Sequence, residues 1–218
     1  MLQDKMTEYD MEELACPKCG HKHTLRKYKR INATQYEDMP DKILKNELFM
    51  FRCEECDFEA PLTYPCLYVD SKHRQVLYLA PVMTREDEEE MAAIEKKYKG
   101  RMRLVDNIND FKEKIMIARN QLDDRVIEVI KIMYIAQLKK EMENDNMLDI
   151  LFDYAGTNMC FIVFFEKKGI GRMPLSIEYY RGIAAQYDKK IREHSHDGFM
   201  KVDIEWAGKV LGTDRKGS

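Results

Sequence analysis

Apolar and aromatic residues in the first third of the chain come in short runs that polar, turn-forming residues interrupt, a pattern typical of β-strands. Residues 64–69 and 75–79 are two such runs, rich in β-branched, aromatic and leucine side chains, and the polar residues 70–74 separate them. We therefore predict a hairpin in this part of the chain. Residues 1–12 show no comparable pattern and are expected to form a loose polar lead-in.

One short helix is expected among these strands. Asp38 or Met39 suits its cap and Pro40 its first turn, where a missing backbone N–H costs nothing. Its apolar side would consist of Ile43, Leu44 and Leu48. After the hairpin, acidic residues 86–90 favour a helix N-terminus, so we expect a solvated helix or linker that ends at Gly100.

The second half of the chain shows the wider spacing of amphipathic helices. Asn109 or Asp110 is a candidate cap, and Glu113 stands three residues after Asp110 as in a capping box. Asp123 is expected to cap a longer helix that is apolar almost all round, which predicts a central helix packed on more than one side. Its apolar residues are Val126, Ile127, Val129, Ile130, Ile132, Met133, Tyr134, Ile135 and Leu138.

A small sheet should follow this helix. The apolar runs at residues 148–154 and 159–165 flank a segment, residues 155–158, with the turn chemistry of a hairpin. The remaining predicted elements are a third strand over residues 170–175, a helix that starts at Ser176 or Leu175 and runs to about Glu193, and a short helix near residues 203–211.

Composition places the chain among soluble globular proteins. Of its 218 residues, 44% are apolar and 34% are charged, and the net charge of -3 gives no general attraction to nucleic acid. The acidic N-terminal residues do not resemble a secretory signal, and the longest apolar run, residues 159–165, is too short to span a bilayer. We therefore expect a cytoplasmic protein that does not interact with membranes.

Four of the six cysteines form two Cys-x-x-Cys pairs, Cys16 with Cys19 and Cys53 with Cys56. In a reducing compartment such pairs are more often metal ligands than structural disulfides. Two thiolates from each of two tight turns would complete the tetrahedral set that a structural Zn²⁺ ion prefers, and two facing knuckles of this kind make a zinc ribbon. The alternatives are a redox dithiol or disulfides, although one reactive pair would not explain the other. Four thiolate ligands leave no open coordination position, which argues against zinc catalysis.

The histidines are secondary candidates. His21 and His23 follow the first cysteine pair, and either could replace a cysteine as a ligand, but we expect both to be surface residues of a strand. His194 and His196 could bind a metal loosely, although a solvated loop is the expected setting.

A basic segment follows the first cysteine pair. Its candidate nucleic-acid-binding residues are Arg26, Lys27, Tyr28, Lys29 and Arg30, in which the cations would contact phosphates and the aromatic ring would stack a base. The alternative is a solvated strand face whose cations pair with the acids at residues 54–55 or 86–90.

The chain resembles the CpXC family of bacterial proteins, which is named for a repeated Cys-Pro-x-Cys motif. The matching segments are residues 16–20, 31–33 and 47–49, the pair Cys53 and Cys56, residues 64–68 and the hairpin that continues to Pro81. The likeness is good over residues 14–83 and loose beyond them. Glu54 stands where the family would have its second proline, and Asp57 replaces a glycine, which implies a more flexible second knuckle. The resemblance implies zinc and the fold, and it implies no activity.

We expect an α+β fold, with an N-terminal zinc-ribbon-like β domain that holds one short helix and a C-terminal α+β domain with a central apolar helix and a small antiparallel sheet. The predicted segments are a zinc-ribbon domain over residues 13–84, a charged helical linker over residues 85–102 and the C-terminal domain over residues 103–212.

The expected function is a zinc-binding, non-enzymatic binding or adaptor module whose partner is another protein. Nucleic-acid binding by the basic segment is one alternative. An enzyme housed in the C-terminal domain is another, with the available acids Asp123, Asp124, Asp149, Asp153 and Glu166.

Overall fold

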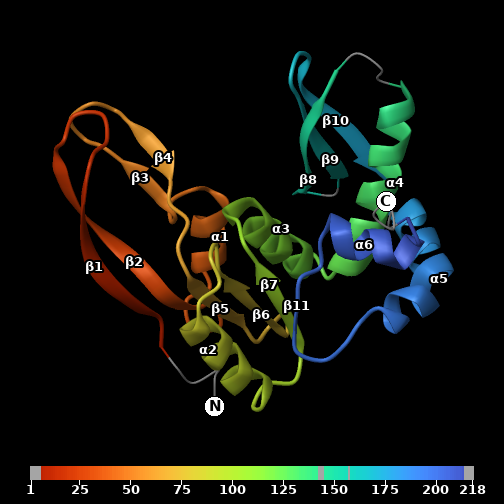
Figure 1. Cartoon of the computed structure of the whole chain (residues 1–218), viewed down its shortest axis with the longest axis horizontal. Helices are drawn as coiled ribbons and strands as arrows, with labels where there is room; N and C mark the ends of the chain where they lie inside the picture. Colours follow the sequence, from red (N-terminus) through yellow and green to blue (C-terminus); the bar gives the residue numbers. More distant parts are fainter. Residues whose placement is uncertain (1–5, 142–144, 157, 214–218) are drawn as a thin grey trace. The chain divides into compact units, whose positions relative to one another are not determined.

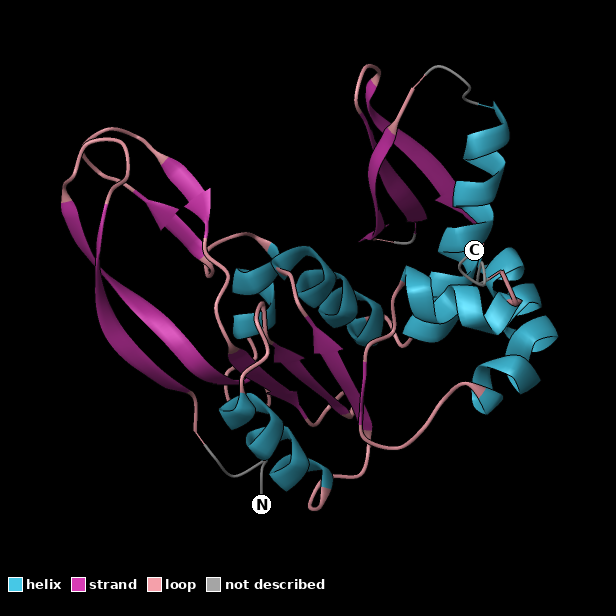
Figure 2. Cartoon of the chain, in the orientation of Figure 1, coloured by secondary structure: helices cyan, strands magenta, loops and turns pink. Residues whose placement is uncertain are grey.

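A computed structural model describes residues 6–141, 145–156 and 158–213. These residues form a mixed α+β protein with six helices and three sheets, as predicted for the fold class (Figure 2). The chain divides into two compact units, residues 1–112 and 113–218.

The sheet of the first unit contains five of its strands in the order β1-β2-β5-β6-β7. They are β1 (Glu8–Ala15), β2 (Lys22–Asn32), β5 (Cys66–Asp70), β6 (Gln75–Leu79) and β7 (Arg101–Val105). Neighbours run antiparallel in β1–β2 and β5–β6 and parallel in β2–β5 and β6–β7. The predicted hairpin is confirmed as β5–β6, and every residue of these two strands is buried.

The polar lead-in predicted over residues 1–12 is wrong from residue 8 onward, because β1 occupies those positions; residues 1–5 lie outside the described part of the chain. No residue of β1 is buried, and its apolar Tyr9 and Met11, which alternate with acids, are exposed. Cross-strand ion pairs between its acids and the cations of β2 accompany the backbone ladder.

A second, two-stranded sheet pairs β3 (Met50–Arg52) with β4 (Glu59–Pro61). The short helix α1 (Met39–Leu44) precedes it, with Pro40 in its first turn as predicted. Figure 1 shows the β1–β2 hairpin and the β3–β4 hairpin meeting at their loop ends.

The charged stretch after β6 forms α2 (Arg85–Glu95), which ends a few residues before the predicted stop at Gly100. Thr84 and Asp87 make a reciprocal cap, in which the Thr84 hydroxyl accepts the Asp87 N–H and the Asp87 carboxylate accepts the Thr84 N–H. The residues predicted as a linker therefore become α2 and the start of β7, both within the first unit.

Helix α3 (Ile108–Arg119) contains the division between the two units. Asn107 caps it, since its side-chain oxygen lies 2.8 Å from the Asp110 N–H nitrogen. The predicted cap at Asn109 or Asp110 is therefore wrong, because both residues already belong to the first turn. Phe111 fixes this turn in the core of the first unit, with ring contacts to Phe49 and Tyr68.

The second unit is built around α4 (Asp124–Glu141), which confirms the predicted central helix. Residues on several sides of α4 are buried in one core with residues of the small sheet and of the last two helices. The other elements are β8 (Met147–Ala155), β9 (Asn158–Phe165), β10 (Gly169–Leu175), α5 (Ile177–Glu193), β11 (Phe199–Met200) and α6 (Ile204–Leu211). The sheet order β10-β9-β8 is antiparallel throughout, and Ser176 and Asp203 cap α5 and α6.

Five charged side chains are buried between α3 and α4, and we call them the charge network. They are Glu113, Lys114, Asp124, Glu128 and Lys131. Lys131 Nζ donates to Glu113 at 2.9 Å and to Glu128 at 3.1 Å, and Lys114 Nζ donates to Glu128 at 2.9 Å. Glu113 also accepts the Phe152 N–H of β8 at 2.6 Å. The network therefore ties α3, α4 and β8 together inside the second unit.

Candidate metal centre

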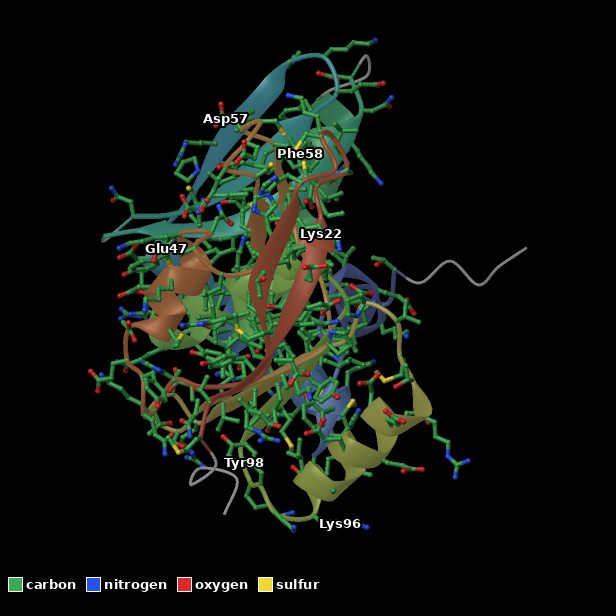
Figure 3. The ribbon with its side chains drawn as sticks, turned by 90° about the vertical axis from the view of Figure 1, so that its left-hand side faces the viewer. Lys22, Glu47, Asp57, Phe58, Lys96 and Tyr98 are labelled. Carbon is green, nitrogen blue, oxygen red and sulfur yellow. The ribbon has the colours of Figure 1, made fainter. Side chains whose placement is uncertain are left out.

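The two cysteine pairs occupy equivalent loops of two hairpins. The first loop joins β1 to β2 and the second joins β3 to β4. In each loop the first cysteine donates its N–H to the carbonyl five residues later, Cys16 to His21 and Cys53 to Phe58, both at 2.8 Å. Figure 3 shows Phe58 and its neighbour Asp57 in the second of these loops.

Each loop places a residue with positive φ directly after its second cysteine. Gly20 has φ 77° and Asp57 has φ 53°. Glycine adopts this left-handed region freely, and Asp57 adopts it too, which aspartate tolerates better than most residues. The second loop therefore reproduces the geometry of the first without its glycine or its proline.

The four thiols converge at the tips of these loops. Their sulfur atoms all lie within 4.8 Å of one another, with 3.7 Å between Cys16 and Cys56 and 3.5 Å between Cys19 and Cys53. A zinc ion with four Zn–S bonds of about 2.3 Å at tetrahedral corners would separate its sulfurs by about 3.8 Å. The thiols thus fit the dimensions of a tetrahedral metal site, and all four cysteines are free rather than disulfide-bonded.

The electrostatic setting differs among these thiols. Burial raises the pKa of Cys16, but the N–H groups of Cys19 and Lys18 and the neighbouring thiols outweigh burial and lower that pKa to about 7. Burial and the neighbouring thiols raise the pKa of Cys56 to about 12, against the opposing N–H of Phe58. One sulfur is therefore ready to ionise near neutral pH, whereas a full set of thiolates needs the charge of a cation.

Apolar side chains form a small cluster beneath the thiols. Phe51 is 3% exposed and packs with Cys16 and Cys53. The partly buried members of the cluster are Leu14, Leu25, Cys56, Phe58 and Leu62. This cluster is small, so apolar burial contributes little to holding the two hairpins together.

His23 is half-buried beside the thiols, so the expectation of a surface residue is wrong for this histidine. Its Nε2 lies 3.2 Å from Cys53 Sγ, and its ring meets the Phe51 ring edge-on at 5.4 Å between centroids. His21 is exposed as expected, and its Nε2 lies 4.0 Å from Glu55.

The predicted basic segment lies on β2, and its cations pair mainly with acids of β1. The ion pairs are Lys27 with Glu12 at 3.0 Å, Lys29 with Asp10 at 2.7 Å, and Arg30 with Glu8 at 3.0 Å and with Glu90 at 3.4 Å. Arg26 lies 5.1 Å from the centre of the Tyr9 ring, and Tyr28 is only 6% exposed. The cations of β2 therefore form ion pairs, as the alternative interpretation expects. One partner, Glu90, belongs to the expected acidic run, and the other partners lie on β1. Nucleic-acid binding by this segment stays a prediction.

The five acids named for a possible enzyme site make separate contacts in the second unit. Asp123 pairs with Arg125, Asp124 with Lys114, Asp153 with Arg172 and Glu166 with Asn146, while Asp149 accepts the Ile150 N–H. His194 and His196 each contact a backbone carbonyl. Within the described ranges, the four cysteines are the one group of three or more histidine, cysteine or acidic side chains close enough to share a metal ion.

A pocket of about 450 Å³ lies elsewhere in the first unit. Its walls come from β1, β2, β5, β6 and the first turns of α2. At its side the Tyr78 hydroxyl donates to Asp87 at 2.8 Å and to Glu90 at 3.0 Å. The sequence does not predict this pocket, because five separate segments of the chain contribute to it.

Comparison with known proteins identifies one relationship. A family model described as CpXC protein matches residues 14–131, which is more than half of the chain and includes both cysteine pairs. No curated protein and no solved structure matches the chain. No helix in the described residues is long and apolar enough to cross a membrane.

Proposed function

The chain belongs to the CpXC protein family, and from that premise we propose that it is a zinc-binding, non-enzymatic binding or adaptor module. Cys16, Cys19, Cys53 and Cys56 would hold one structural Zn²⁺ ion. The observation that carries the proposal is the convergence of these four thiols within 4.8 Å, from loops 33 residues apart along the chain.

The donor set favours zinc among the common metal ions. Thiolates are soft ligands, and a tetrahedral set of four sulfurs is typical of structural zinc or of iron. Calcium and magnesium prefer oxygen ligands, so they are poor candidates for this site. A bound zinc ion would supply positive charge that keeps all four thiols ionised and would fix the two loops against each other.

The placement of the two loops supports a zinc-ribbon-like arrangement of the β1–β2 and β3–β4 hairpins. β3 and β4 have only three residues each, and an isolated hairpin of that size is unstable in water. Metal binding would therefore supply folding free energy to this end of the first unit.

The absence of a reactive position in a four-thiolate set supports a structural role for the metal. The five candidate acids of the second unit make separate contacts instead of converging on one site, which supports a binding module over an enzyme. We propose that the partner is another protein and that the protein works in the cytoplasm, where a reducing environment keeps free thiols available for metal.

The test is metal analysis of the full chain purified under reducing conditions without added metal. The proposal expects one zinc per chain by mass spectrometry, loss of that zinc in Cys16→Ser and Cys53→Ser, and retention of it in Cys160→Ser, a matched control from β9. Native purification with identification of bound chains tests the adaptor role. Absence of stoichiometric zinc, together with an unchanged fold after exhaustive chelation, would refute the metal centre, and the lack of a reproducible partner would refute the adaptor role.

A further inference from the structure

His23 contacts the candidate metal centre without belonging to its four ligands. Its Nε2 lies 3.2 Å from Cys53 Sγ, within hydrogen-bond distance of the sulfur. We propose that His23 is a positioning residue, which donates an N–H hydrogen bond to the metal-bound thiolate of Cys53 and so connects the first hairpin to the second knuckle. This inference rests on the proposed function.

The ring of His23 is held in place from more than one side. The residue lies on β2 opposite Leu14 of β1, and its ring meets Phe51 edge-on, with an interplanar angle of 88°. The centre of the His21 ring lies 4.9 Å from the centre of the His23 ring. A ring restrained in this way loses little further conformational entropy when it donates a hydrogen bond to the sulfur.

The sulfur of Cys53 is shielded from water. Cys53 is only 3% exposed, so a metal-bound sulfur at this position would depend on donors from the protein rather than on water. His23 supplies such a donor from the opposite hairpin.

The contact needs no charge on the imidazole. A neutral ring with its proton on Nε2 donates to sulfur and leaves Nδ1 as an acceptor. The four cysteine sulfurs would occupy all four tetrahedral positions around a metal ion. The Nε2 atom of His23 would therefore contact a ligand, Cys53, rather than the metal itself, and would orient that ligand. Such partners commonly change metal affinity by about 10- to 100-fold when they are removed.

The experiment compares the full chain with His23→Ala, His23→Gln and the control His21→Ala. Zinc affinity is measured by competition with a chromophoric chelator, and each protein is also loaded with Co²⁺ to record the sulfur-to-cobalt charge-transfer band. The expected result is about a 10- to 100-fold loss of zinc affinity in His23→Ala, partial recovery in His23→Gln, and a change of no more than about twofold in His21→Ala.

The cobalt spectrum separates positioning from general support of the fold. Removing an N–H donor raises the energy of the sulfur lone pairs, so the band of His23→Ala should move to lower energy and that of His21→Ala should not. Unchanged affinity with an unshifted band would overturn the inference. A band intensity of three thiolates in the unmodified chain would also overturn it, because His23 would then be a ligand. If the unmodified chain binds no metal, that result refutes the proposed zinc-binding function itself, and not only the role of His23.

Discussion

Replacing Lys131 by methionine should strongly destabilise the second unit. Methionine is an unbranched side chain like lysine, but it removes the cation that pairs with Glu113 and Glu128. All three side chains are nearly inaccessible to water. Removing one partner of a buried ion pair commonly costs about 3–5 kcal/mol, because the other charge stays buried without compensation.

Most of this cost should fall on Glu113 rather than on Glu128. Glu128 keeps Lys114 at 2.9 Å, whereas Glu113 loses its direct cationic partner. Burial already raises the pKa of Glu113 above its ordinary value of 4.5, although Lys131 and Lys114 oppose that rise. Without Lys131 this carboxyl should take up a proton in the folded state. At about 1.4 kcal/mol per pH unit, holding that proton at pH 7 costs about 3 kcal/mol relative to the unfolded chain.

The sign of the pH dependence follows from the same shift. When the folded state holds its proton more tightly than the unfolded state, stability is lost as pH rises from 4.5 through the folded pKa. The penalty of Lys131→Met should therefore shrink on acidification toward pH 4.5. Glu113→Gln in the same chain should recover part of the loss at pH 7, because the amide oxygen can still accept the Phe152 N–H.

The assay is urea unfolding at several pH values, followed by the fluorescence of Trp206, the single tryptophan, which is buried in the second unit. The control is Arg172→Met, which removes the partly exposed pair with Asp153 and should cost no more than about 1 kcal/mol. The reasoning would be refuted if Lys131→Met lowered the free energy of unfolding by no more than the control does, or if the decrease did not change with pH.

Three further predictions concern the first unit. Asp57→Gly should tighten zinc binding or raise the free energy of unfolding by about 0.5–1 kcal/mol, because glycine adopts φ 53° without strain. Gly20→Ala, at φ 77°, should have the opposite effect. Calorimetry that finds zinc affinity and stability unchanged in these variants would contradict both expectations. Tyr78→Phe removes the donor shared by two carboxylates and should cost about 1–3 kcal/mol in urea unfolding followed by circular dichroism, so a neutral effect would show that this hydrogen bonding is dispensable. If the basic segment binds nucleic acid, Arg26→Glu with Lys29→Glu should abolish salt-sensitive binding in a gel-shift titration, and equal affinity would exclude that surface.

All elements of the second unit except β11 could be predicted, because their signals are local. Asp123, Ser176 and Asp203 each stand next to the start of a helix and hydrogen-bond to its first turn. The turn before β9 likewise follows from its own few residues. Such signals depend on neighbours in the sequence, so a single chain suffices to detect them.

The features that escaped prediction depend on partners distant in sequence. β1 contains no buried residue, and it forms beside β2 with cross-strand ion pairs such as Lys27 with Glu12. The sequence does not predict the charge network, because its charged residues resemble the solvated side of two helices. One signal was available, since Lys131 interrupts a stretch that is apolar almost all round and therefore has to be buried.

The thiol site combines both kinds of information. Each Cys-x-x-Cys pair is a local signal, and its chemistry predicts a metal ligand, but only the fold shows that the two loops meet. The two ends of the first unit differ in what stabilises them: β5 and β6 are buried along their whole length, whereas β3 and β4 have three residues each above a small apolar cluster. Since apolar burial grows with the area covered, the hairpin end has the weaker intrinsic stability. A metal ion bound by the four thiols would therefore add most stability at this end of the first unit, where His23 of the first hairpin also contacts Cys53 of the second.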